Sequence, residues 1–211
     1  MATLFTRRLR LVPLSDAHLE HEIQLDSDPE VVRFVGNGKP RSREQVEQLH
    51  RGRIARGMRV PGLGFWAGFL RTGSPSISDL KRTEGDDTFV GFWILTPPKP
   101  GYQPEHPSPV DGQAELGYRL VRKYWRQGLA KEGAKELLRY GFQDLGLHRV
   151  FAETMAINVA SRATMASVGM RLERTFFEEF EEMIPGSEEG EVEYAITREH
   201  WQTMMQPPGD L

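Results

Sequence analysis

The sequence predicts an α/β domain built around a mixed, largely antiparallel β-sheet. Strand-like and helix-like segments follow one another in the order βααβββαβαββ, in which runs of strands are interrupted by helices. The chain has 211 residues, of which 38% are hydrophobic, enough for one sizeable core and near the upper length of one compact domain. We therefore expect residues 1–211 to form a single domain.

Seven segments have the composition of strands. The first alternates apolar and polar residues, and the next two, "GFWAGFL" and "TFVGFWIL", are rich in aromatic side chains. The expected strands are residues 9–15, 64–70, 88–95, 114–121, 148–155, 170–180 and 190–197. Two connections, about residues 71–87 and 97–112, exceed the usual length of a hairpin loop, so we expect functional covers or mobile segments there.

Four segments carry helix signals. Ser15 or Asp16 is expected to cap the first helix, and Ser42 with Gln45 has capping-box spacing at the start of the second. The fourth starts near residue 158 and is expected to end at Gly169. The third carries one stripe of apolar and small residues, namely Ala130, Ala134, Leu137, Leu138 and Gly141.

Composition argues against several classes of protein. The 27 Lys and Arg against 30 Asp and Glu give a net charge of -3, which argues against nucleic-acid and membrane-surface partners. Cysteine is absent from the sequence, so disulfides, thiolate nucleophiles and Cys-ligated zinc are excluded. The N-terminal residues lack the apolar core of a signal peptide, and no stretch approaches the roughly 18 apolar residues of a membrane span. We expect a soluble, cytoplasmic protein.

Rival motifs fail on inspection. "GNGKP", residues 36–40, lacks the flanking residues of a P-loop, and "GLGFWA", residues 62–67, leads into a strand instead of a helix. His18 and His21 share one predicted helix without an acidic or histidine cluster at metal-binding spacing, so we expect no metal site and assign them surface or capping roles.

The stretch "RKYWRQGLAKEGAKELL", residues 122–138, joins a predicted strand to the third helix through a turn of small residues. The first N–H groups of a helix lack partners within it, and the helix dipole adds partial positive charge, so this turn can seat an anion. Gly128 lets the backbone approach a phosphate, and Ala130 keeps the first turn thin. The cations around the turn are Arg122, Lys123, Arg126 and Lys131. The alternative is a plain turn glycine beside a solvated helix face.

Three segments, "TRRLRLVPLSDAHL", "WRQGLAKEGAKELL" and "NVASRATMASVGMRLERT", occur in this order. They resemble the GCN5-related N-acetyltransferase (GNAT) family, closest to its RimJ/RimL-like branch, and the resemblance spans about residues 4–201. The family's turn reads Arg or Gln, two residues, Gly, one residue, then Gly or Ala. Here Trp125 takes the first position, followed by Gly128 and Ala130. Arg126 stands where many relatives have another glycine, so phosphate binding depends on residue 126 needing no left-handed backbone.

The resemblance implies a single acetyltransferase domain that moves an acetyl group from acetyl-CoA to an amine, on a sheet with helices on both faces and a splayed central strand pair. The cofactor-binding core would be about residues 114–170. The backbone of Leu120 and Val121 would pair with the pantetheine amides. The pyrophosphate would lie on the amides of Arg126, Gln127, Gly128, Leu129 and Ala130.

Two further site residues are implied by the resemblance. Asn158 would contact the pantetheine arm, and Ser161 would lie near the thioester sulfur as a candidate proton donor. The structural alternatives are a helix N-cap for Asn158 and a backbone hydrogen bond for the Ser161 hydroxyl.

Direct attack by an amine requires its neutral form. A lysine amine with a pKa of about 10.4 costs about 4–5 kcal/mol to deprotonate at pH 7, whereas an α-amine near 7.7–8 costs about 1 kcal/mol. The candidate bases are Glu115 and Glu153, in consecutive predicted strands, and a structural salt bridge is the alternative for each. Tyr118 lies on the opposite strand face from Glu115, so we expect only one of them to border the acceptor cleft.

The acceptor itself is weakly specified. Residues 176–193 hold eight glutamates and no Lys or Arg, which favours a cationic acceptor such as a basic peptide N-terminus or a polyamine; a solvated acidic loop is the alternative. Other readings stay open: another donor such as succinyl-CoA, a non-catalytic acyl-CoA-binding module, or an interaction protein that uses "PEHPSP". Both a monomer and a homodimer are compatible with the sequence.

Overall fold

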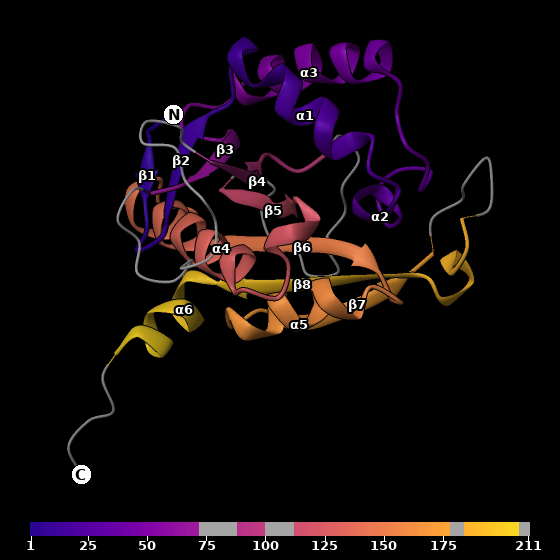
Figure 1. Cartoon of the computed structure of the whole chain (residues 1–211). Helices are drawn as coiled ribbons and strands as arrows, with labels where there is room; N and C mark the ends of the chain where they lie inside the picture. The colour runs from indigo at the N-terminus through magenta and orange to yellow at the C-terminus, as the bar shows by residue number, and fades with distance from the viewer. Residues whose placement is uncertain (72–87, 100–111, 178–183, 207–211) are drawn as a thin grey trace.

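The computed structural model describes residues 1–71, 88–99, 112–177 and 184–206 (Figure 1). Eight strands form one sheet in the order β1-β2-β3-β4-β5-β6-β8-β7. The strands are β1 (Leu4–Phe5), β2 (Leu9–Pro13), β3 (Gly64–Leu70), β4 (Phe89–Thr96), β5 (Gln113–Leu120), β6 (Arg149–Met155), β7 (Arg171–Phe176) and β8 (Glu191–Thr197). All neighbours are antiparallel except β5 and β6, which confirms the predicted mixed, largely antiparallel sheet. Most of the two long predicted loops, residues 72–87 and 100–111, lies outside the described residues.

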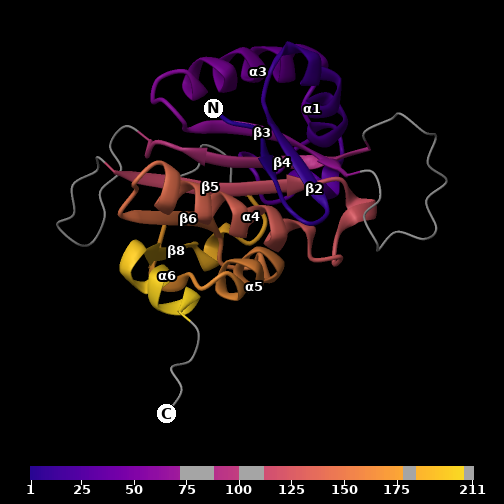
Figure 2. The same ribbon diagram turned by 90° about the vertical axis from the view of Figure 1, so that its left-hand side faces the viewer.

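Helices cover both faces of the sheet. They are α1 (Leu19–Asp26), α2 (Pro29–Val32), α3 (Arg43–Gly57), α4 (Leu129–Arg139), α5 (Val159–Ser167) and α6 (Arg198–Met205). One core cluster joins α1 and α2 to aromatic side chains of β3 and β4, and a second joins α4, α5 and α6 to the other face. Figure 2 shows α1 and α3 together at the top of the view, with α4, α5 and α6 lower down. None of the helices in the described part of the chain has the length and apolar content to cross a bilayer.

Local signals explain most helix starts. Ser42 and Gln45 form the predicted capping box of α3. The sequence analysis missed α2 and α6. Helix α2 has only four residues, too few to show a period, and begins with the Asp28 cap and Pro29 at its first position. Helix α6 begins at the Thr197 cap, directly after β8 without a loop.

Helix α4 approaches the sheet closely because one position lacks a side chain. A Cβ on Gly133 would lie 2.3 Å from the indole nitrogen of Trp93 on β4, so only glycine fits there. The same indole nitrogen donates a hydrogen bond to the carbonyl of Ala130 at 3.2 Å. Trp93 therefore fixes the first turn of α4 against the sheet.

The central strands β5 and β6 separate after a short parallel contact. Their pairing runs only from Gln113 with Arg149 to Glu115 with Phe151, although β5 continues to Leu120 and β6 to Met155. Strand β5 stays paired with β4 along this length, so the gap opens on its β6 side. This is the splayed central pair that the resemblance implied.

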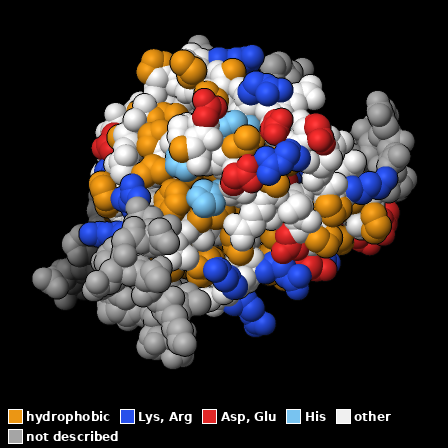
Figure 3. All heavy atoms as spheres, turned by 45° about the horizontal axis from the view of Figure 1, so that its top comes forward, with side chains coloured by type: hydrophobic (Ala, Val, Ile, Leu, Met, Phe, Trp, Pro, Cys, Tyr) orange, Lys and Arg blue, Asp and Glu red, His pale blue; other side chains and the backbone are white. Residues whose placement is uncertain are grey.

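Two histidines lie on the face that carries α1 and α3. Figure 3 brings this face forward and shows histidine side chains among hydrophobic ones. His21 stacks on Phe89 with ring centroids 4.2 Å apart, and the His18 ring lies 5.8 Å from that of Phe69. Burial lowers the pKa of both histidines. The nitrogen Nδ1 of His18 accepts a hydrogen bond from the Ser15 backbone at 3.0 Å, which confirms a capping role.

Candidate active site

The turn between β5 and α4 has an unusual backbone. After a 3₁₀ turn at Arg122–Tyr124, Arg126 has a φ of 59° and Gly128 a φ of 74°, so two residues of the turn are left-handed. Among the described residues, Arg126 is the only non-glycine with positive φ. Successive backbone N–H groups in such turns can form a concave anion site.

The carbonyl groups of this turn are tied into the fold, whereas its N–H groups are not. Gln127 O accepts from Arg8 Nη1 at 2.9 Å, Gly128 O from the Glu132 amide at 3.0 Å and Ala130 O from Trp93. Within the described chain, the amides of residues 126–130 have no hydrogen-bond acceptor. A row of unpaired donors at the positive end of a helix is suited to binding a phosphate group.

The conformation of Arg126 corrects one expectation. Phosphate binding was expected only if residue 126 needed no left-handed backbone, and Arg126 is left-handed with a φ of 59°. The amides nevertheless remain free, because a Cβ in this region raises the energy of the backbone and does not block its N–H. The departure from glycine therefore costs conformational energy and leaves the donors in place.

A second network holds the turn from the side. The guanidinium of Arg8, in the connection between β1 and β2, donates through Nε to Glu132 at 2.6 Å, besides its bond to Gln127. Glu132 also accepts from the Arg8 amide at 2.7 Å and from the Thr6 hydroxyl at 2.5 Å. Burial would raise the pKa of Glu132, but these hydrogen bonds outweigh it and lower the pKa. Sequence reasoning missed this network, which joins the N-terminus to the helix start.

A cavity of about 420 Å³ adjoins the turn. Of the cofactor-binding candidates, those that line it are Leu120, Arg126, Gly128, Leu129, Ala130 and Asn158. Val121 and Gln127 do not line it. Its cations include Arg126 and Lys131, as predicted. The other two predicted cations point elsewhere: Arg122 lies 3.8 Å from Asp28, and Lys123 lies over the Tyr124 ring.

Strand β5 offers backbone groups of Tyr118 and of the expected Leu120 to the gap, whereas those of the expected Val121 are bonded elsewhere. The Val121 amide donates to Val90 O at 2.9 Å, and its carbonyl accepts from the Tyr124 amide at 2.9 Å, so both polar backbone groups of Val121 have partners within the protein. The Leu120 carbonyl accepts from the Trp125 indole at 2.7 Å. Since Val121 bonds to β4, alternation along an antiparallel strand turns the Leu120 N–H and both polar groups of Tyr118 towards the gap.

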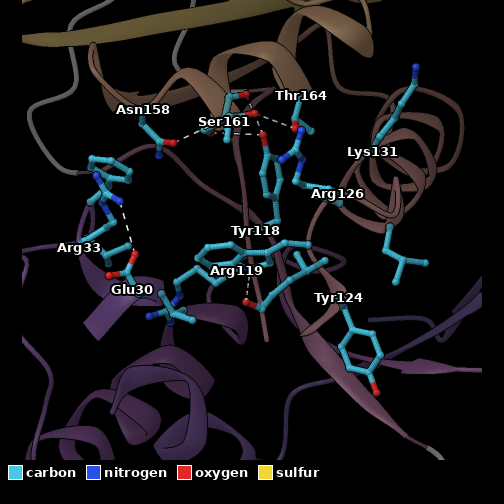
Figure 4. A pocket seen from close by; sticks show the side chains of 18 of the residues that line it. Glu30, Arg33, Tyr118, Arg119, Tyr124, Arg126, Lys131, Asn158, Ser161 and Thr164 are labelled. Atoms are coloured by element: carbon cyan, nitrogen blue, oxygen red, sulfur yellow. Dashed lines mark hydrogen bonds and ion pairs between the residues drawn. The ribbon is translucent and has the colours of Figure 1, made fainter. Parts of the chain in front are cut away.

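Three side chains meet where the gap reaches α5. Asn158 caps the helix by accepting from the Ser161 amide at 3.2 Å, while its own amide donates to Thr154 at 3.0 Å. The Tyr118 hydroxyl lies 3.1 Å from the Ser161 carbonyl and 3.3 Å from the Ser161 hydroxyl. Figure 4 shows Tyr118 pointing from β5 towards Ser161 and Thr164.

The Tyr118 hydroxyl is a proton donor at neutral pH. Burial raises its pKa above the ordinary value of 10, and this outweighs the opposing effect of hydrogen bonds with Ser161 and Thr164. The sequence predicted only which face of the strand Tyr118 lies on, and it predicted no chemical role for the Tyr118 hydroxyl. The contact with Ser161 spans 43 positions, so no local pattern could have indicated it.

A second cavity, of about 380 Å³, lies on the other side of this junction. Glu115, Glu153, Tyr118, Asn158 and Ser161 all line it, so the two candidate bases and the candidate acid are brought together. The prediction that only one of Glu115 and Tyr118 borders the acceptor cleft is wrong, because the gap between β5 and β6 opens this cavity to both strand faces.

Both candidate bases also have cationic neighbours. Glu115 lies 3.5 Å from Arg56 on α3, and Glu153 lies 3.7 Å from Lys99. Each side chain keeps some exposure, 22% for Glu115 and 15% for Glu153. The salt-bridge alternative therefore applies to each, and it leaves both carboxylates accessible from the cavity.

The acidic run from residue 176 to residue 193 is only partly described. Glu178, Glu179, Glu181 and Glu182 fall within residues 178–183, outside the described residues. Glu193 is 1% exposed and accepts ion pairs from Arg149 and Arg174, so its charge is neutralised inside the protein. Glu191 lines the second cavity.

Comparisons with known proteins identify the family. A family model described as the acetyltransferase (GNAT) domain matches residues 8–171. An FsC-acetyl coenzyme A-N(2)-transacetylase from Aspergillus fumigatus is 43% identical over 205 residues, which cover 97% of this chain and 80% of that protein. The uncharacterized N-acetyltransferase p20 of Bacillus licheniformis is 36% identical over 177 residues, covering 82% and 84%.

Solved structures show the same fold. Spermidine N-acetyltransferase from Vibrio cholerae, in complex with CoA and spermine, superposes with a TM-score of 0.68 at 15% identity, covering 92% of this chain and 98% of that one. RimL, a ribosomal L7/L12 α-N-protein acetyltransferase in complex with coenzyme A, superposes with a TM-score of 0.66 at 17% identity, covering 90% and 94%.

Proposed function

The chain belongs to the GNAT acetyltransferase family, and we propose that it acetylates a primary amine by direct attack of that amine on acetyl-CoA while both substrates are bound. Acetyl-CoA-dependent N-acetyl transfer is the activity of the family. The observation that carries the proposal is the row of amides at residues 126–130, which have no acceptor within the described ranges of the chain and lie beside a gap bordered by two cavities.

The cofactor is proposed to run from the turn into the gap. The amides of residues 126–130 would hold the pyrophosphate, with Arg126 and Lys131 adding positive charge. The Leu120 N–H and the polar backbone groups of Tyr118 would pair with the pantetheine arm, and Asn158 would border it. The thioester then lies where the two cavities share Tyr118, Asn158 and Ser161.

The chemistry requires two proton movements. The neutral amine attacks the thioester carbonyl carbon, the carbon–sulfur bond breaks, and the amine loses one proton. Glu115 or Glu153 would take that proton, directly or through water. Ser161 would donate a proton to the departing thiolate and take one in turn from the protonated Tyr118 hydroxyl, so no alkoxide remains on Ser161. Solvent would then return a proton to Tyr118 and remove the one held by the glutamate base.

The acceptor is proposed to be a small molecule or peptide with an accessible primary amine. The relatives named above act on spermidine, on the α-amine of a ribosomal protein and on a nitrogen designated N(2). An α-amine, which costs about 1 kcal/mol to deprotonate at pH 7, demands less of Glu115 or Glu153 than a lysine side chain.

The test is release of free CoA thiol from acetyl-CoA with a panel of amines that includes a peptide N-terminus, a polyamine and an amino acid. We expect release that depends on both substrates and falls in Glu115→Gln or Glu153→Gln, whichever residue is the base. Succinyl-CoA at the same concentration tests the donor, and we expect slower release. Binding of acetyl-CoA without thiol release for any amine would overturn the proposal.

A further inference from the structure

We call the second cavity, lined by Glu115 and Glu153, the acceptor cavity. Beside it lies a buried group of charged side chains that the proposed chemistry does not use. Asp26 on α1 is fully buried and accepts ion pairs from Arg119 on β5, from Arg53 on α3 at 3.1 Å and from Arg41 at 3.3 Å. Glu22, also on α1, accepts from Arg53 at 2.7 Å and from His50 at 2.6 Å. We call these residues the arginine cluster.

The arginine cluster carries more positive than negative charge. Three guanidinium groups, those of Arg41, Arg53 and Arg119, face two carboxylates, Glu22 and Asp26. An uncompensated charge in a buried position is costly unless it has a partner. Burial lowers the pKa of Arg119 to about 10, with the neighbouring arginines acting in the same direction. A bound anion would compensate this excess.

Arg119 has donors to offer. Its side chain is 10% exposed and gives one hydrogen bond, from Nη1 to Asp26. A guanidinium has five N–H donors, so most of those of Arg119 have no acceptor within the described chain. Arg119 lines both cavities, and Figure 4 shows it on the opposite side of β5 from Tyr118, towards the helices of the N-terminal half.

The acceptor cavity is therefore lined by groups of both signs. Arg53, Arg119 and Lys99 contribute cations, whereas Glu115, Glu153 and Glu191 contribute carboxylates. On β5, Gly117 separates Glu115 from Arg119, and its missing side chain leaves room between the acidic and the basic position. A cavity arranged in this way is complementary to a molecule that has an amine and an anionic oxygen.

We infer that the acceptor is an amine that also carries a carboxylate, an amino-acid-like zwitterion whose carboxylate binds Arg53 and Arg119 while its amine faces the thioester. This rests on the proposed transferase function and names its substrate class. A planar, bidentate guanidinium is suited to a carboxylate. The alternative is a purely cationic acceptor attracted by the glutamates of residues 176–193. A zwitterionic site would bind an amine with a carboxylate more tightly than the same amine without one, and a cationic site would do the reverse.

The test compares amines that differ in the carboxylate alone. L-lysine and 1,5-diaminopentane differ only by that group, and L-lysinamide keeps its shape without its charge. Their affinities for the CoA-loaded protein are measured by calorimetry, and turnover is measured separately as thiol release. We expect the wild-type protein to bind L-lysine at least about tenfold more tightly than 1,5-diaminopentane or L-lysinamide, which lack the carboxylate. This is the usual effect of a hydrogen bond to a charged group.

Two variants separate recognition from folding. Arg53→Gln should remove most of this preference. Arg43→Gln, on the same helix α3, should keep it, because Arg43 pairs with the exposed Glu20 outside the arginine cluster and is not among the residues that line the acceptor cavity. The wild-type comparison needs no variant, so it decides the matter even if Arg53→Gln does not fold. Equal or tighter binding of the diamine, or equal preferences in both variants, would overturn the inference. Preferential binding of L-lysine without thiol release would instead overturn the transferase proposal alone.

Discussion

Replacing Arg126 by glycine is expected to stabilise the protein relative to Arg126→Ala, because residue 126 is left-handed. A residue with a Cβ at a φ of 59° carries a conformational cost of about 1–2 kcal/mol. Glycine avoids that cost, but its freer unfolded chain offsets about 0.5–1 kcal/mol of the gain. The difference of about 1 kcal/mol corresponds to a melting temperature about 2–4 °C higher for a domain of this size.

The comparison with alanine isolates the backbone. Both variants lose the guanidinium at the cofactor cavity, so they should lose the same affinity for acetyl-CoA, and only their thermal stability should differ. Calorimetric unfolding of the two variants and the wild type, without cofactor, measures the effect. If Arg126→Gly melts at or below the temperature of Arg126→Ala, the left-handed conformation of residue 126 carries no such cost and the reasoning fails.

Three further outcomes follow from the site. Gly128→Asp should weaken acetyl-CoA binding about tenfold or more by placing a carboxylate at the start of α4. Gly146→Asp, at another left-handed glycine with a φ of 71°, should leave acetyl-CoA binding unchanged. Equal affinities of the two variants for acetyl-CoA would contradict the prediction. Glu132→Gln should lower the melting temperature at pH values above 4.5. The melting temperatures of the variant and the wild type should converge as the pH falls through the lowered pKa of Glu132. A difference that persists in acid would contradict a stabilising role for the ionised Glu132. Ser161→Ala should reduce kcat about a hundredfold or more without changing the affinity for acetyl-CoA, and an unchanged kcat would exclude Ser161 as the proton donor.

The parts of the site that sequence predicted are those written in consecutive residues. The turn at Gly128 and Ala130 shows itself through small residues ahead of a helical period, and Asn158 through its capping position. Turns and helix caps are determined by residues that are adjacent in the sequence, so a local pattern reveals them. The turn before α4 and the cap of α5 were for this reason predictable from the sequence.

The acceptor side depends on contacts between distant positions. Arg119 and Asp26 are 93 positions apart, and Tyr118 reaches Ser161 across 43. The hydrogen bond from Val121 to Val90 has a similar origin: the direction of the Val121 N–H depends on the register of β5 against β4, which the sequence of one strand does not reveal. Tertiary pairing, and not local propensity, decides these positions.

The two sides of the site share one physical feature. At the turn, the carbonyls of Gln127, Gly128 and Ala130 are bonded within the fold, whereas the amides of residues 126–130 have no acceptor among the described residues. In the gap, β5 is paired with β4 while the Leu120 amide faces the separated β6. In the arginine cluster, Arg119 donates one hydrogen bond to Asp26, and its other N–H groups have no acceptor in the part of the chain that the structure describes. Unpaired polar groups cost free energy when they are shielded from water, so a fold retains them only where a ligand or solvent can satisfy them. The hydrogen bonds that these residues already make within the fold fix the directions of their remaining N–H groups. A ligand that binds these N–H groups therefore costs little conformational entropy in the protein.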